Sequence, residues 1–299
     1  MARNHAHDRS RLKFTLVLTG GYCLVEFIGG LLTHSLALLS DAGHMLSDVS
    51  AMGLSLFAAY IATLPVTSQK TFGYYRAEIL AAFLNGLALW LVAGVIFREA
   101  YYRFFSPPEV HGHGMLIVAS VGLLVNLVTV WLLRDAQHSN LNIHGVFLHV
   151  LGDALGSVGA IFASIVILWT GWNWVDPLTS VVIGLLVLVS SFSLVRESVD
   201  ILMQATPRHL DLAEIQATIE AIPGVNQVHD LHVWTLTSGL FTLTAHVVIN
   251  GATDHHALLD SIEHRIQQHF AIDHTTIQLE PHDRQQNEPS HFYGRRAQR

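Results

Sequence analysis

Long apolar stretches alternate with short polar breaks over the first two thirds of the 299-residue chain. A helix needs about 20 apolar residues to cross the hydrocarbon core of a bilayer. Six stretches are near or above this length: residues 14–32, 36–64, 79–101, 115–133, 146–169 and 177–195. The breaks between them are rich in residues typical of turns. The pattern predicts six transmembrane helices with both chain ends on one side of the membrane.

The last third of the chain has a different pattern. Residues 211–221 and 254–270 have helical spacing, whereas residues 225–236, 240–250 and 275–280 read as short strands. This order predicts a small α+β domain of the αββαβ type. The predicted divisions are an N-terminal segment, a six-helix transmembrane domain, an α+β domain and a disordered polar tail, at residues 1–13, 14–206, 207–283 and 284–299.

Composition supports a chain that is largely solvated by lipid. Apolar residues make up 51% of it and charged residues 13%, about half the charged share of a typical soluble domain. From residue 207 onward, 6 basic and 11 acidic residues give a net charge of −5, which argues against a nucleic-acid partner. If the N-terminus is cytoplasmic, only Arg98 and Arg103 lie near the opposite face. The positive-inside rule therefore predicts cytoplasmic termini.

The few ionisable residues inside the apolar stretches are the strongest functional signal. The second stretch contains His44 and Asp48, and the fifth contains His149 and Asp153. An Asp at bilayer depth costs about 2.5–3.5 kcal/mol on insertion scales. Residues four apart share one face of a helix, so two opposed pairs would offer two nitrogens and two oxygens to one divalent ion. Zinc suits this set best, while cadmium, cobalt and nickel stay open.

These residues also allow other interpretations. A single His-x-x-x-Asp is usually a hydrogen bond on a helix surface, but two copies inside apolar stretches favour metal. An intramembrane metalloenzyme is one alternative, but a catalytic metal normally keeps one coordination position open, whereas this set supplies four ligands. A passive channel is another, but it needs several weak binding sites rather than one strong site. Glu26, Asn85 and Asn126 suit interhelical hydrogen bonds. Asp176 is expected to cap the sixth helix, and Asp41 to orient a ligand or face the cytoplasmic opening.

Several motifs together resemble the cation diffusion facilitator family, in particular its zinc-transporting bacterial branch. They are the two His-x-x-x-Asp pairs and four longer runs: SLALLSDAGH at residues 35–44, FGYYRAE at 72–78, FLHVLGD at 147–153 and HDLHVW at 229–234. The resemblance covers residues 14–280 and is specific because the motifs occur together.

The resemblance implies a homodimeric antiporter that exports zinc in exchange for protons. It places the protein in the bacterial inner membrane, with the lipid bilayer, divalent ions and protons as its partners and a metallochaperone-like domain in the cytoplasm. It assigns His44, Asp48, His149 and Asp153 to the transport site. Zinc is then substrate and regulatory ligand, and no organic cofactor is expected.

The resemblance also implies a metal site in the cytoplasmic domain. The matching positions are His229, His246 and Glu280, with weaker candidates at His255, His256, Asp273 and His274. His232, His264, His269 and His282 are expected at the surface. The segment between the second and third stretches has no histidine, so the additional metal site of some relatives is expected to be absent.

Overall fold

The computed structural model describes residues 2–134, 141–250 and 254–281 of the chain. They form two compact units. One comprises the chain to Tyr60 together with Leu80–Arg196, and the other joins Ile61–Ile79 to the chain from Glu197 onward. The connection between the second and third helices therefore folds with the C-terminal domain.

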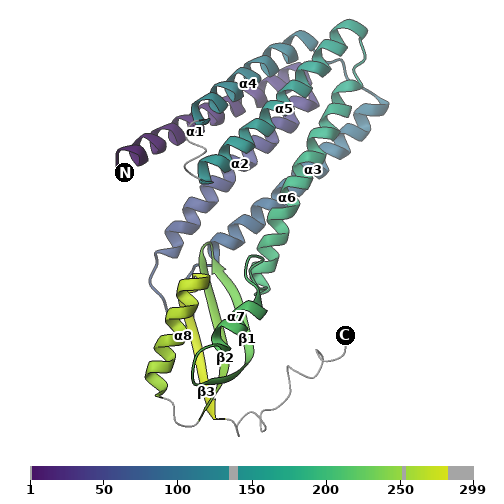
Figure 1. Cartoon of the computed structure of the whole chain (residues 1–299). Helices are drawn as coiled ribbons and strands as arrows, with labels where there is room; N and C mark the ends of the chain where they lie inside the picture. The colour runs from purple at the N-terminus through teal and green to yellow at the C-terminus, as the bar shows by residue number, and fades with distance from the viewer. Residues whose placement is uncertain (1, 135–140, 251–253, 282–299) are drawn as a thin grey trace. The chain divides into compact units, whose positions relative to one another are not determined.

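Six long helices precede the C-terminal domain in the described part of the chain (Figure 1). They are α1 (Ala2–Thr33), α2 (Leu36–Ala62), α3 (Ala77–Phe105), α4 (Gly112–Leu133), α5 (Leu141–Thr170) and α6 (Val175–Leu202). Among the described residues, α3 to α6 each include a segment long and apolar enough to cross a membrane, and α1 has a shorter apolar segment. The crossing of the bilayer by all six helices stays a prediction.

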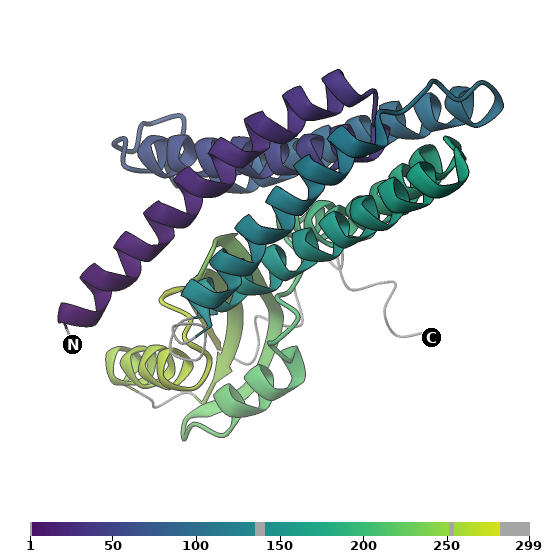
Figure 2. The same cartoon turned by 90° about the horizontal axis from the view of Figure 1, so that it is seen from above.

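Small residues allow the helices to pack closely in pairs. A side chain at Gly29 or Gly122 would collide with α1–α4 neighbours, because Gly29 faces Val118 and Gly122 faces the ring of Tyr22. Gly86 of α3 likewise meets a side chain of α6. Such contacts let backbones approach and increase van der Waals packing, which holds helices together in lipid. Figure 2 shows α1 and α4 from above.

Helix α2 packs against both α1 and α5. The Sγ atom of Cys23 on α1 is buried and lies 3.5 Å from the carbonyl oxygen of Ala42, to which it donates. On the other side, an oxygen of Asp41 lies 3.3 Å from the position that a Cβ atom on Gly156 would occupy. The absence of a side chain at Gly156 therefore lets the buried Asp41 carboxylate approach the α5 backbone.

The C-terminal domain confirms the predicted αββαβ order. Its elements are α7 (Leu212–Glu220), β1 (Val225–Thr237), β2 (Leu240–Ile249), α8 (His255–Phe270) and β3 (His274–Pro281). The sheet order is β1-β2-β3, with β1 antiparallel and β3 parallel to β2. Asp211 and Asp254 cap the two helices by accepting backbone N–H groups. Both helices contribute to one apolar core with the sheet, including Ile215, Ile219, Leu243, Val247, Ile262 and Ile266.

The FGYYRAE motif joins the C-terminal domain through its two ends. The ring of Phe72 lies edge-on to that of His274, with centroids 5.8 Å apart. Glu78, in the first turn of α3, accepts hydrogen bonds from Thr237 Oγ1 at 2.6 Å and Ser238 Oγ at 2.9 Å. The motif thus contacts the start of β3 and the turn between β1 and β2.

Candidate metal sites

The structure describes the side chain of one residue from each predicted His-x-x-x-Asp pair, His44 and Asp153. His44 Nε2 on α2 lies 3.8 Å from Asp153 Oδ1 on α5, although 109 residues separate them. Asp153 is 5% exposed and His44 16% exposed. The structure therefore brings together one imidazole and one carboxylate of the predicted set. Asp48 and His149 lie on the same two helices, but their side chains lie outside the described residues.

A buried acidic group adjoins this pair on α1. Glu26 is 1% exposed, and its Oε1 accepts a hydrogen bond of 3.1 Å from the hydroxyl of Tyr22. Glu26 is close enough to interact with Asp41 and, electrostatically, with Asp153. The structure thus gathers Glu26, Asp41 and Asp153, from three helices, in one buried region. Asp41 faces α5 here, and its role, to orient a ligand or to face the cytoplasmic opening, stays a prediction.

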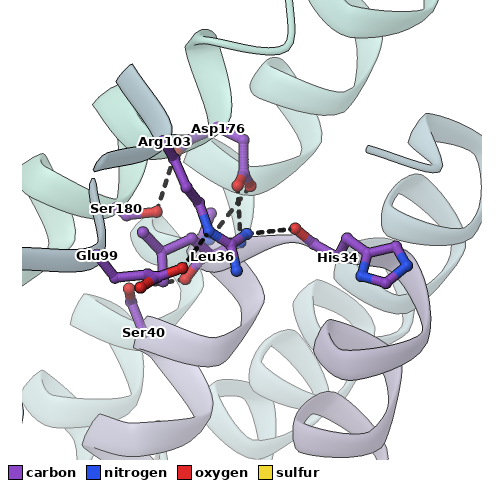
Figure 3. Close-up of polar contacts among 8 residues, drawn as sticks. His34, Leu36, Ser40, Glu99, Arg103, Asp176 and Ser180 are labelled. Carbon is purple, nitrogen blue, oxygen red and sulfur yellow. Dashed lines mark hydrogen bonds and ion pairs between the residues drawn. The ribbon is translucent and has the colours of Figure 1, made fainter. Parts of the chain in front are cut away.

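Asp176 differs from its expected role. It is fully buried at the start of α6, yet its carboxylate caps α2 (Figure 3). Oδ1 accepts hydrogen bonds from Ser35 Oγ at 2.6 Å and Ala37 N at 3.2 Å, and Oδ2 accepts from Leu36 N at 2.7 Å. The expectation that Asp176 caps its own helix is wrong. Helix α6 begins one residue earlier, at Val175, and the side chain meets the free N–H groups of α2 instead.

A second contact fixes the same turn between α1 and α2. His34 has a left-handed backbone, with φ of 58°, and its carbonyl oxygen accepts a hydrogen bond of 2.6 Å from Arg103 on α3. Arg103 also forms an ion pair of 2.9 Å with Glu99 one turn earlier. Figure 3 shows Arg103 between His34 and Glu99. The turn is therefore held from α3 and from α6.

The C-terminal domain contains a compact group of potential metal ligands. His229 on β1 pairs with His246 on β2 in the antiparallel register. Glu280 follows two residues after Gln278, the parallel partner of His246, and so lies on the same face of the sheet. His229 Nε2 lies 3.2 Å from Glu280 Oε2, and His246 Nδ1 lies 3.3 Å from Glu280 Oε1.

This trio is shielded from solvent to different degrees. Glu280 is fully buried, His229 is 11% exposed and His246 is 23% exposed. One ligand atom from each lies within 4.8 Å of the others. Two imidazoles and a carboxylate form a donor set that suits zinc. The site is therefore accessible from the side of the histidines and closed behind the carboxylate.

Asp230 lies beside the trio and was not singled out in the sequence. It interrupts the β1–β2 register and has a left-handed φ of 50°. Its Oδ1 lies 2.8 Å from His232 Nε2, and its Oδ2 lies 3.8 Å from His246 Nε2. His232 is mostly exposed, as expected. Alternation alone could not reveal Asp230, because the bulge changes the direction of its side chain.

The weaker candidates are not part of this group among the described residues. His255 and His256 are exposed in the first turn of α8, and Asp273 is exposed and accepts a hydrogen bond from Gln267 at 3.1 Å. His274 begins β3 opposite Thr242, whereas Glu280 pairs near the other end of that strand. Six residues of strand separate His274 from Glu280 by about 20 Å.

Comparisons with known proteins identify the class to which this arrangement belongs. Residues 12–203 match the family profile described as the cation efflux transmembrane domain, and residues 207–282 match that of the cation efflux protein cytoplasmic domain. The chain is thus a multi-pass membrane protein that transports metal cations and is not an enzyme. It belongs to the cation efflux family, also called the cation diffusion facilitators.

Three bacterial relatives illustrate the range of names in this family. A "cadmium, cobalt and zinc/H(+)-K(+) antiporter" of Bacillus subtilis (strain 168) is 44% identical over 287 residues, covering 94% of this chain and 92% of the relative. The "metal cation efflux system protein CzcD" of Cupriavidus metallidurans is 45% identical, covering 94% and 90%. "Zinc transporter ZitB" of Escherichia coli (strain K12) is 43% identical, covering 94% and 93%.

A solved structure also matches the C-terminal part of the chain. It is the metal-bound C-terminal domain of the CzcD transporter, 44% identical, with a TM-score of 0.23. The match covers 24% of this chain and 99% of that domain.

Proposed function

We propose that this chain exports zinc from the cytoplasm in exchange for protons, through a site formed by His44, Asp48, His149 and Asp153. The observation that carries the proposal is the 3.8 Å between His44 Nε2 and Asp153 Oδ1. Two ligands of one tetrahedral zinc ion are separated by about 3.3 Å, because each zinc–ligand bond is about 2.0–2.1 Å long. An approach of about half an ångström would let both atoms hold one ion.

Proton exchange follows from the chemistry of these ligands. Imidazole and carboxylate groups bind metal in their deprotonated forms, so binding an ion displaces any protons they hold. The name of the Bacillus subtilis relative includes cadmium, cobalt, zinc and protons, which supports the same exchange here. Cadmium, cobalt and nickel are further candidate substrates, since nitrogen and oxygen donors accept all of them.

The proposed orientation places both termini in the cytoplasm of a bacterium, with the helices in its inner membrane. The basic residues support this orientation. The chain acts as a homodimer, as the family resemblance implies. A carrier of this kind exposes its site to one side of the membrane at a time.

The trio of His229, His246 and Glu280 serves as a regulatory zinc site. Its nitrogen–oxygen distances of 3.2 and 3.3 Å already match the spacing of about 3.3 Å between ligands of tetrahedral zinc. These residues bind and orient the ion, and zinc joins the three elements that carry them. Occupancy would therefore stiffen the sheet between β1 and β3.

Transport by the purified full-length chain in liposomes tests the proposal. Zinc uptake should require a pH gradient, and Asp153→Asn should abolish it. The matched control Glu109→Gln makes the same change at an exposed acid and should retain uptake. Gradient-dependent uptake by Asp153→Asn would refute the transport site. Equal uptake after collapse of the gradient would favour a channel over an antiporter.

A further inference from the structure

The cap that Asp176 forms on α2 is more extensive than a single hydrogen bond. Three donors from Ser35, Leu36 and Ala37 converge on one carboxylate that is fully buried. The Ser35 hydroxyl also accepts a hydrogen bond from Leu38 N at 3.2 Å. Hydrogen bonds to a charged acceptor are shorter and about twice as strong as neutral ones. The first turn of α2 is thus held firmly to the start of α6.

This cap joins α2, which carries the proposed ligand His44, to the start of α6, the helix that follows α5. His44 lies eight residues after Leu36 on α2, about 12 Å along the helix axis. Asp176 lies six residues after Thr170, the last residue of α5. A short connection therefore ties Asp176 to the helix that carries Asp153, while its carboxylate holds the helix that carries His44.

The connection between α5 and α6 is itself anchored. The Asn173 side chain accepts a hydrogen bond of 3.2 Å from Val110 N, before α4. Asp176 N donates to the carbonyl oxygen of Asn173 at 3.3 Å. The carboxylate is thus presented to α2 from a turn whose backbone is fixed, rather than from a loose loop.

Helical geometry makes the register of α2 decisive for the site. An α-helix turns by about 100° per residue, so a shift of α2 by one residue would turn His44 away from Asp153. The cap selects the one register in which the N–H groups of Leu36 and Ala37 meet the carboxylate. It thereby also selects the rotation that leaves His44 Nε2 at 3.8 Å from Asp153.

We propose that Asp176 is a positioning residue for metal transport: by capping α2 from the start of α6, it sets the depth and rotation of His44 relative to Asp153. The inference rests on the proposed transport site. Asp176 does not touch the ion. Its contribution is to preorganise two ligands on different helices, which reduces the rearrangement needed when zinc binds.

Graded variants test this role in the full-length chain in liposomes. Asp176→Asn keeps the size of the side chain but replaces one accepting oxygen with an NH2 group, which then faces the donor of Leu36 or those of Ser35 and Ala37. Ser35→Ala removes only one of the three donors. Initial zinc uptake is measured against zinc concentration under a fixed pH gradient. We expect Asp176→Asn to raise the half-saturating zinc concentration roughly tenfold or more, as lost support of metal ligands does. Ser35→Ala should raise it less.

The control is Glu109→Gln, which changes an exposed acid in the connection between α3 and α4 and should leave half-saturation unchanged. Thermal unfolding of each variant is recorded without zinc. A variant with lower thermal stability but wild-type half-saturation would show a merely structural cap and overturn the inference. If Asp176→Asn does not fold, wild-type half-saturation in Ser35→Ala overturns it.

A parallel Asp153→Asn variant separates the two proposals. Loss of uptake in Asp153→Asn together with wild-type half-saturation in Asp176→Asn overturns only the positioning role. Uptake by Asp153→Asn that equals the wild type overturns the transport site and the positioning role together. Loss in Asp153→Asn with the graded shift in the other two variants supports both.

Discussion

Replacement of Glu280 by Gln should remove most of the stabilisation that zinc gives to the C-terminal domain. Glu280 is fully buried and supplies the carboxylate of the trio, whose other two members are histidines. Gln preserves its shape but is a much poorer zinc ligand. We expect zinc affinity to fall at least about a hundredfold, the upper range for loss of a residue that merely supports a ligand.

The size of the effect follows from linkage. At free zinc 100 times above the dissociation constant, binding stabilises the wild-type domain by about 2.7 kcal/mol. A hundredfold weaker site gains only about 0.4 kcal/mol at the same zinc concentration. The difference of about 2.3 kcal/mol corresponds to roughly 9–18 °C in Tm for a domain of this size. The domain has its own apolar core, so residues 207–283 can be studied separately.

The assay compares the Tm of this fragment with and without zinc, which cancels any change in its metal-free stability. Asp260→Asn is the matched control, because Asp260 is an exposed acid on α8. It should keep the wild-type zinc shift. The assignment of Glu280 as a ligand would be refuted if Glu280→Gln kept the full zinc-induced increase in Tm. It would also be refuted if this increase fell equally in both variants.

Three further predictions concern packing, the loop motif and pH. Gly86→Val should destabilise the helical domain in detergent by about 1–3 kcal/mol, because the new side chain meets Val195. Gly94→Val is the control, since open space surrounds Gly94 and the change should have little effect. Thermal unfolding measures the stability of both variants. Glu78→Ala should lower the free energy of unfolding by about 1–3 kcal/mol, because two hydroxyl donors at the β1–β2 turn lose their acceptor. Denaturant unfolding of the full chain measures this change, and an unchanged midpoint of unfolding would contradict the prediction. The zinc-induced Tm shift of the C-terminal fragment should shrink from pH 7.5 to about pH 5.5, because protons compete with zinc for imidazole; a shift independent of pH would exclude histidine ligands.

Local pattern was sufficient to predict much of this molecule. Strand alternation placed His229 and His246 on adjacent strands, and the register confirms that they are direct partners. Helical spacing predicted helices over residues 211–221 and 254–270, and α7 and α8 confirm both. Such features depend on neighbours in the sequence, so spacing reveals them.

Features that depend on distant segments could not be predicted in this way. Asp176 has the sequence context of a cap for α6, yet its donors lie about 140 residues earlier. Asp230 approaches His246 only because the strand bulges. Glu78 meets the β1–β2 turn across 159 residues. In each case a side chain satisfies groups on another element, and no local periodicity encodes that choice.

The buried thiol on α1 gives the helical domain an intrinsic chemical reporter. Cys23 is the only cysteine in the chain and is 5% exposed where α1 meets Ala42 of α2. A thiol reagent can reach it only when those two helices separate, so its alkylation rate during turnover would record how often they part. In the resting protein the same burial would shield Cys23, so cysteines introduced at exposed positions could be labelled there first, without removal of the native thiol.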